Sequence, residues 1–569
     1  MRHTLHVMLL LLLLCCLAGP FAAAEQRCMF DRISRKAGSR RRSLVLELPD
    51  RERGGAQVLT ASVSGWAPIR FKVFSEDMNN PSKYCTAAGE TRPDLAGGTL
   101  VCRQQDVFTD EKKSIILNRV LPRAIQMHVD RLYVEPFTDA LVIPGFSPGD
   151  ICGEFTIPSS HHTTGVSGAD VFLYAAAAPT EGSILAWAVG CAELDTGRSV
   201  VGVIDFGPES AADSESSVRV AAHEIAHTIG FESYTFEDRK MVQTASGVRG
   251  KGTVVHMTTP NVLEKTRAHF NCMSAPGMEL EDEGGDGTTS SHWERRNAKD
   301  ELMAGLTGAG HYTALTLAAF ADMGFYRVQW GMAEPMAWGK DSGCELLTQK
   351  CLTNGVTNYP EMFCGSKSNL LVCTSDRLAL GYCTIYTHQN PLPAQFQYFT
   401  DPKVGGFANA LMDYCPYIQE YDNMRCIDGS ENVMPGSRVG PKSKCLKGDG
   451  LRGSKGSLGD VCAEVSCDDD RVSVRYLGDD TWHTCPEGGS IAPAGSFTSG
   501  KILCPRRIEV CSQLQEEDGD DSGDTEGDTE GDLNGGTETP PNLDASRLHS
   551  VFFPLVSTAF FVVAVGAVW

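Results

Sequence analysis

The sequence predicts an α+β fold in which a mixed-sheet lobe is followed by a looser central lobe and a disulfide-rich C-terminal domain. Strand-like runs alternate with helical patterns over residues 61–231, which is typical of a mixed α/β lobe. An apolar helical stretch, Val218–Phe231, closes that lobe and carries the pattern His-Glu-x-x-His. Thirteen cysteines lie in Gly-rich sequence from Cys344 to Cys511, a density typical of a domain held by disulfides.

The N-terminus has the pattern of a secretory signal. Arg2 precedes an apolar core from Val7 to Leu17, and Ala22-Ala23-Ala24 offers a cleavage site, so residues 1–24 are expected to be removed. Nineteen cysteines then remain, an odd number. They predict nine disulfides formed in an oxidising compartment and one cysteine with another role. Cys28 is the candidate, because it stands apart from the other eighteen, which begin at Cys85.

Residues 25–60 predict a propeptide, because they are basic and poor in core residues. Within them, Cys28 can supply a thiolate to a catalytic metal and keep a precursor inactive, as a cysteine switch. The alternative is a lone thiol that pairs with nothing. The two interpretations differ in whether Cys28 contacts the metal site.

The chain becomes globular from Trp66, and residues 61–231 form the predicted N-terminal lobe. Residues 111–134 have helical spacing, with a bend expected at Pro122. Pairing Cys85 with Cys102 and Cys152 with Cys191 is expected, since each bond closes a fairly short loop within this lobe. The predicted strands are Ile69–Val73, Ala140–Ile143, Asp170–Ala175, Ile184–Val189 and Val200–Phe206.

Residues 232–343 predict a central lobe with few long apolar runs and one helix, Thr313–Gly324. Residues 344–511 form the Cys-rich domain. Because its thirteen cysteines are an odd number, one of them is expected to pair with Cys272 in the central lobe.

The C-terminal residues predict a membrane anchor of the glycosylphosphatidylinositol (GPI) type. Residues 512–550 are acidic and then Gly/Pro/Thr-rich, as in a solvated stalk. Residues 551–569 are mostly apolar with no charged residue in or after them, which favours a GPI signal over the alternative, a transmembrane tail anchor. Asn534 and Asp544 are the two candidate attachment residues. The protein is therefore expected on the outer face of the plasma membrane.

The net charge of −22 argues against nucleic acid as a partner. Much of that charge lies in the acidic stalk, so the folded body is only moderately acidic. The sequence contains no feature that defines an oligomeric state.

The pattern His223-Glu224-x-x-His227 predicts a catalytic zinc site. Residues i and i+4 share one face of a helix, so two imidazoles at this spacing can bind one zinc ion. Glu224 can then act as the general base that takes a proton from water. Ser216 or Ser217 is expected to cap the helix, and Gly230 to end it. The alternative, a buried amphipathic helix with two polar spots, requires the motif to arise by chance.

A catalytic zinc needs a third protein ligand. In the metzincin pattern His-Glu-x-x-His-x-x-Gly-x-x-His, the third histidine follows the glycine by three residues. Here Gly230 is present but position 233 is Ser, so the ligand must come from farther along the chain. The candidates are His256, His269, His292 and His311. Met303 follows His292 by eleven residues and is a candidate for the methionine turn below the metal.

The sequence resembles the leishmanolysin family, the surface metallopeptidases of trypanosomatid parasites. The resemblance is carried by the block His223–Phe231, by Ser291–Met303, by Tyr312–Leu317 and by Asp322–Tyr326. Upstream, Gly149–Phe155 and Leu185–Ala188 are also similar, and the match extends over roughly residues 28–510.

The resemblance implies a metzincin-like catalytic lobe, with His223, His227 and His292 binding one Zn²⁺ per subunit. It implies that Glu224 is the general base and that Met303 forms the Met-turn. Arg27-Cys28 matches the family's Arg-Cys switch, although Gln26 stands where a His is usual. The family's activity is hydrolysis of protein and peptide substrates, so a zinc metalloendopeptidase is expected.

Two other classes of function remain open: a surface adhesin that binds host or vector proteins, and a structural coat protein. The complete set of ligands, base and methionine favours the enzyme. Adhesion and catalysis are compatible in one protein.

Overall fold

The computed structural model describes residues 65–511 except 148, 183, 286–287, 307 and 469–470. Before residue 65 it describes 28, 30, 32–33, 43–44 and 46–48. The expected signal, most of the propeptide, the stalk and the candidate anchor lie outside these residues, as do Asn534 and Asp544. Among the described residues, no helix combines the length and the apolar character needed to cross a membrane.

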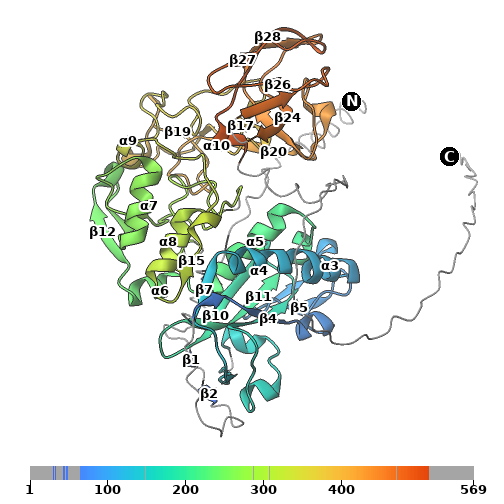
Figure 1. Cartoon of the computed structure of the whole chain (residues 1–569), viewed down its shortest axis with the longest axis vertical. Coiled ribbons are helices and arrows are strands. Elements are labelled where there is room, and N and C mark those ends of the chain that lie inside the picture. The colour runs from blue at the N-terminus through green and yellow to red at the C-terminus, as the bar shows by residue number, and fades with distance from the viewer. Residues whose placement is uncertain are drawn as a thin grey trace, which may run out of the picture. The chain divides into compact units, whose positions relative to one another are not determined.

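A five-stranded mixed sheet forms the framework of the N-terminal lobe (Figure 1). Its central strands β9 and β11 are buried along their whole length, as their mostly apolar residues favour, and β11 is also rich in β-branched residues. β4 and β9 pair parallel, as do β9 and β11, whereas β10 runs antiparallel to β11. The order is β1 (Ser43–Leu44), β10 (Ala186–Glu193), β11 (Ser199–Phe206), β9 (Val171–Ala176) and β4 (Phe71–Phe74).

Two helices lie side by side on this sheet: α5 (Glu215–Thr228) packs on β10 and β11, and α4 (Leu121–Val129) packs against α5 (Figure 1). The predicted single helix over residues 111–134 is wrong at its end. α3 (Asp110–Ile115) leads through a π-helical turn (Ile116–Val120) into α4, because Pro122 cannot complete an α-helical hydrogen bond there. The chain then leaves the helix and forms β7 (Leu132–Val134), which pairs with β3 (Ala67–Pro68) and β15 (Arg327–Val328).

The residues that follow α5 fold into helices and a small sheet that abut the same core. Trp293, Met303 and Phe320 are buried together with residues of α5, so these elements pack against the helix that carries the His-Glu-x-x-His motif. The elements are α6 (Ser233–Asp238), the sheet β12 (Val242–Ser246), β13 (Thr253–Met257) and β14 (Met278–Glu279), then α7 (Pro260–Phe270) and α8 (Ala314–Asp322).

The C-terminal residues form short strands with little helix, as their Gly-rich sequence predicts. Two four-stranded sheets enclose a separate apolar cluster around Val474 and Phe497. The strands of the first sheet are, in order, β21 (Ser443–Leu446), β24 (Val461–Asp468), β25 (Arg471–Arg475) and β26 (His483–Thr484). Those of the second are β23 (Gly456–Ser457), β22 (Gly448–Gly453), β28 (Phe497–Leu503) and β27 (Ser490–Ile491). A three-stranded sheet consists of β16 (Val372–Cys373), β17 (Ala379–Cys383) and β20 (Ile418–Arg425). A two-stranded sheet consists of β18 (Tyr386–Thr387) and β19 (Val404–Gly405).

Nine disulfides join the eighteen cysteines from Cys85 onward. Cys85 pairs with Cys102 and Cys152 with Cys191, so both bonds in the N-terminal lobe are local rather than crossed. Cys272 pairs with Cys344 and thereby ties the end of α7 to the start of α9 (Cys344–Thr348). The others are Cys351–Cys415, Cys364–Cys383, Cys373–Cys445, Cys426–Cys462, Cys467–Cys511 and Cys485–Cys504.

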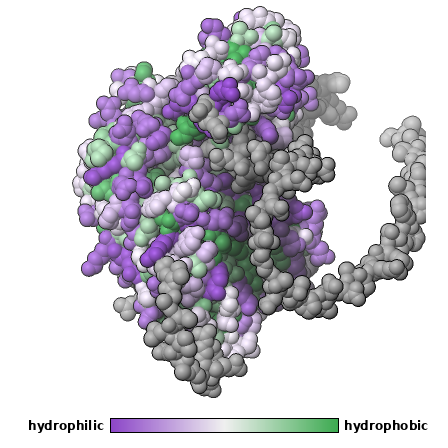
Figure 2. Space-filling model, viewed as in Figure 1, coloured by the Kyte–Doolittle hydropathy of each residue, from purple (hydrophilic) through white to green (hydrophobic). Residues whose placement is uncertain are grey.

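Hydrophilic residues dominate the described surface in the view of Figure 2, with small hydrophobic patches between them. Large exposed apolar side chains such as Val101, Met273 and Val356 come from separate parts of the chain. A surface of this kind is ordinary for a protein in water.

Candidate metal centre

The helix α5 positions the two histidines of the sequence motif. Its cap is Ser214, not Ser216 or Ser217 as the sequence suggested: the Ser214 hydroxyl accepts the backbone N–H of Ser217 at 3.1 Å. With Ser214 as the cap, the acidic Glu215 lies in the first turn, beside the positive end of the helix dipole. This interaction favours a helix that begins at Glu215. The helix ends at Thr228, and Gly230 follows with φ +114°, a conformation that glycine adopts readily.

Three histidine nitrogens converge in the interior. His223 Nε2 lies 3.1 Å from His227 Nε2, and each lies 3.2 Å from His292 Nε2. The three rings are buried. Nitrogens bound to one tetrahedral zinc lie about 3.3 Å apart, given the usual zinc–nitrogen bond length. The triangle therefore fits a single tetrahedral cation.

The opposite nitrogen of each ring faces a carbonyl oxygen. His223 Nδ1 lies 2.6 Å from Leu302 O, His227 Nδ1 lies 2.7 Å from Phe231 O, and His292 Nδ1 lies 3.0 Å from Thr288 O. Nδ1 must carry the proton to donate these bonds, which leaves each Nε2 lone pair directed at the common centre. Burial lowers the pKa of His223 to about 4 and those of His227 and His292 well below the usual range, so the rings are neutral.

Glu224 lies beside this triangle with its carboxylate in the interior. One oxygen, Oε2, is buried and has no hydrogen-bond partner among the described residues. Burial raises the pKa of Glu224 to about 8, against hydrogen bonding from Cys28 that lowers it. A buried carboxylate with a raised pKa and an unused oxygen suits a general base.

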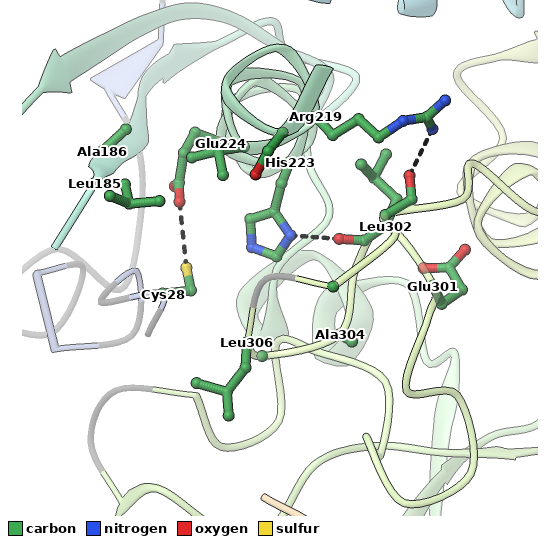
Figure 3. A pocket seen from close by; sticks show the side chains of 15 residues that line it. Cys28, Leu185, Ala186, Arg219, His223, Glu224, Glu301, Leu302, Ala304 and Leu306 are labelled. Atoms are coloured by element: carbon green, nitrogen blue, oxygen red, sulfur yellow. Dashed lines mark hydrogen bonds between the residues drawn. The ribbon is translucent and has the colours of Figure 1, made fainter. Parts of the chain in front are cut away.

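Cys28 lies at the same centre. Its Sγ is 3.6 Å from Glu224 Oε1 and 3.6 Å from His227 Nε2, and Figure 3 shows the thiol pointing at the Glu224 carboxylate. One ligand atom from Cys28 and one from each of the three histidines lie within 4.8 Å of one another. Phe30 stacks on the His227 ring with 4.1 Å between ring centroids, and Phe30 is buried. The thiol therefore occupies the fourth corner of the histidine site.

Met303 follows Leu302 in the turn and is fully buried. The preceding residue, Leu302, supplies the carbonyl that His223 contacts, as Figure 3 shows. Met303 O accepts the backbone N–H of Trp293, the residue after His292. The turn thus contacts His223 directly and lies against the segment that carries His292.

The structure brings none of the other candidate histidines into this site. His256 lies on β13 opposite Glu279, His269 contacts the Trp338 carbonyl at 2.8 Å, and His311 lies 3.9 Å from Glu334. Ser233, at the position where the metzincin pattern has histidine, begins α6 instead. The chain between Gly230 and His292 forms α6, the β12–β14 sheet and α7 before it returns.

A pocket opens beside His223 and Glu224 (Figure 3). Arg219 also lines the pocket. Its guanidinium forms an ion pair with Glu334 at 2.6 Å, which directs it away from the three histidines. The larger apolar side chains that line the pocket are Leu185, Val220, Leu302 and Leu306, and Glu301 lines it as well. Sequence reasoning did not single out Leu302, because its contribution is a backbone carbonyl, which no side-chain pattern reveals.

Comparison with known proteins agrees with this geometry. A sequence profile of leishmanolysin matches residues 48–517. The chain is 35% identical to leishmanolysin of Leishmania major over 478 residues, covering 80% of this chain and 78% of that protein. It is 36% identical to a leishmanolysin homolog of Crithidia fasciculata over 465 residues, covering 78% of this chain and 71% of that protein. It is 27% identical to a leishmanolysin-like peptidase of Drosophila melanogaster over 537 residues, covering 71% of this chain and 78% of that protein. The chain therefore belongs to the leishmanolysin family and is a metalloendopeptidase.

Proposed function

We propose that this protein is a zinc-dependent endopeptidase in which His223, His227 and His292 hold the metal. The observation that carries the proposal is the triangle of Nε2 atoms, each made a lone-pair donor by the carbonyl at its own Nδ1. Three lone pairs at 3.1–3.2 Å repel one another unless a cation lies between them. An all-imidazole set suits zinc, and it leaves a fourth position for chemistry.

Zinc, when bound, supplies Lewis acidity at this centre. The chain supplies the proton transfers. Glu224 takes a proton from the attacking water, whose oxygen bonds to the scissile carbonyl carbon, and then gives the proton to the leaving nitrogen as the carbon–nitrogen bond breaks. The raised pKa of Glu224 suits both roles, because the carboxyl must accept and release one proton in each turnover. Met303 supports the site from below through the turn that holds His223.

Substrate is proposed to bind along β10. Among the described residues, β1 pairs with β10 only at Ala192 and Glu193, so the stretch Ala186–Val189 pairs on one side alone, with β11. That stretch lies next to the pocket and to Glu224. An extended peptide can pair with its open backbone groups and place an apolar side chain in the pocket.

Removing the metal is expected to abolish cleavage. A zinc chelator should reduce hydrolysis of a peptide by the mature protein to background, and added zinc should restore it. His292→Ala should lower bound zinc and abolish activity, since it removes one of three ligands. His269→Ala is the matched control and should keep both, because His269 is a partly buried histidine whose ring contacts the Trp338 carbonyl and Phe270. Cleavage that survives chelation, or full zinc occupancy without His292, would contradict the proposal.

We also propose the domain plan and a switch. Residues 1–24 are the signal, 25–60 the propeptide, 61–231 the catalytic lobe, 232–343 the central lobe, 344–511 the Cys-rich domain, 512–550 the stalk and 551–569 the anchor signal. The position of Cys28 between Glu224 and His227 supports its role as a cysteine switch that blocks the fourth position. Binding to host or vector proteins at the cell surface is compatible with this plan.

The mature protein is proposed to be held at the cell surface by a GPI anchor attached at Asn534 or Asp544. The support is the apolar segment 551–569, which contains no charged residue and lies behind a polar spacer. Treatment of intact cells with a phosphatidylinositol-specific phospholipase should release the protein into the medium. A mature chain that still contains Trp569 would exclude the anchor and favour a tail-anchored protein.

A further inference from the structure

Glu301, two residues before Met303, is a buried carboxylate that collects four hydrogen bonds. Its Oε2 accepts the backbone N–H of Met303. Its Oε1 accepts the N–H of Thr313 at 3.3 Å and the Thr313 hydroxyl at 2.9 Å. The Thr316 hydroxyl donates to the same oxygen at 2.6 Å. These partners lie on the methionine turn and on the first residues of α8.

The direction of these bonds follows from the other partners of the two hydroxyls. Thr313 Oγ1 accepts the N–H of Leu315 at 3.1 Å, and Thr316 Oγ1 accepts the indole N–H of Trp293 at 2.9 Å. Each hydroxyl has one hydrogen, which it can therefore give to Glu301. The Glu301 side chain is an acceptor in all four bonds, which is the role of a carboxylate. Burial raises the pKa of Glu301 to about 7, and the accepted hydrogen bonds oppose that rise.

Through these bonds Glu301 connects the supports of two histidines. On one side it fixes the turn whose Leu302 carbonyl contacts His223 Nδ1. On the other side it reaches Trp293, the neighbour of His292, through the Thr316 hydroxyl. The two segments also meet directly, since the Trp293 N–H donates to Met303 O at 2.9 Å. A single buried carboxylate therefore sets how the His223 and His292 rings stand relative to each other.

We propose that Glu301 is a positioning residue for the metal centre, acting through the Leu302 carbonyl and Trp293 rather than by contact with substrate. This inference rests on the proposed function. Groups that orient metal-binding histidines typically change metal affinity or activity by about 10–100-fold when they are altered. Glu301 also lines the pocket beside His223, but both of its carboxylate oxygens accept hydrogen bonds from the chain, so its loss should lower metal affinity and kcat while leaving KM nearly unchanged.

The test is Glu301→Gln in the full-length protein after activation. Glutamine keeps the shape but replaces one acceptor oxygen with an NH₂ group. Whichever oxygen is replaced, the NH₂ group then faces a hydrogen-bond donor of the chain. Zinc affinity, measured by competition with a chromogenic chelator, should fall about 10–100-fold. kcat should fall by a similar factor with KM within about twofold, and the visible absorption of the cobalt-substituted protein should shift. Thr316→Val should give a smaller loss, and Thr316→Ser, which keeps the hydroxyl, should restore wild-type behaviour.

The matched control is Asp205→Asn. Asp205 is a buried carboxylate on β11 whose Oδ1 accepts the Ala178 N–H at 2.8 Å, so the change removes a buried acid without touching the turn. It should alter thermal stability but not zinc affinity. Wild-type zinc affinity, kcat and cobalt spectrum in a folded Glu301→Gln would overturn the inference. If that variant does not fold, Thr316→Val decides between the outcomes. A wild-type protein that neither binds zinc nor cleaves peptide would instead remove the proposed function.

Discussion

Glu224→Gln should bind zinc as tightly as the wild type and lose nearly all peptide cleavage. Glutamine has the volume and polarity of glutamate but cannot accept the proton of water. The general base contributes about 10²–10⁴-fold to such reactions, so kcat should fall by roughly that factor. The three histidines remain with their carbonyl partners, so metal content should not change. Zinc content by mass spectrometry and steady-state hydrolysis of a peptide are the two measurements.

Glu232→Gln is a matched control for this variant. Glu232 is a buried glutamate just beyond the same helix, and its Oε1 accepts the Thr235 hydroxyl at 2.9 Å. Activity within a few fold of the wild type is expected, because Glu232 lies outside the pocket. Substantial cleavage by Glu224→Gln, with Glu232→Gln unchanged, would refute the role of Glu224 as the base.

Cys28→Ser should turn a latent precursor into an active one. The Cys28 thiol lies 3.6 Å from both Glu224 Oε1 and His227 Nε2, a position from which the proposed switch would exclude the attacking water. Serine is a much weaker zinc ligand than a thiolate, so water should regain the fourth position. Activity of the unprocessed chain is expected to rise at least about tenfold, measured with a quenched-fluorescence peptide under conditions that prevent processing.

The control for Cys28→Ser is the same chain after residues 25–60 are removed. Both versions are then identical in sequence and should have the same kcat and KM. A Cys28→Ser precursor that stays as latent as the wild-type precursor would show that the thiol is not the switch. A wild-type precursor already as active as the processed protein would exclude latency altogether.

The strands, the two lobe disulfides and the motif helix follow local rules that a sequence displays. β9 and β11 are continuous apolar runs, and α5 combines apolar spacing with a glycine stop. The end of α4 was not predictable in the same way, since Leu132–Val134 has helical spacing and becomes a strand only because β3 and β15 offer partners. The cap of α5 was displaced because Ser214, Ser216 and Ser217 are equivalent in sequence, and only the folded turn distinguishes them.

The third histidine illustrates a limit of spacing arguments. His256, His269, His292 and His311 are all buried or nearly so in the structure, and residue type alone does not separate them. What separates them is that α6, the β12–β14 sheet and α7 fill the interval after Gly230, and the chain returns to the site at residues 288–292. Resemblance to a family supplied that information, whereas helix and strand periodicity did not. Glu301 had no sequence signal, because its partners are brought together by the turn.

The short strands before residue 49 bear on how latency ends. Ser43–Leu44 pairs with β10, and Leu46–Leu48 pairs with β8 (Ala140–Val142), while Cys28 lies in the metal centre. The same chain is therefore attached at separate points, and each attachment raises the local concentration of the others. A single cut between Cys28 and Ser43 would separate the Cys28 segment from the two paired strands, which stay joined through the chain to the catalytic lobe. In the proposed precursor, avidity therefore supports the thiol contact until that cut is made, and the Cys28 segment then dissociates at its own rate.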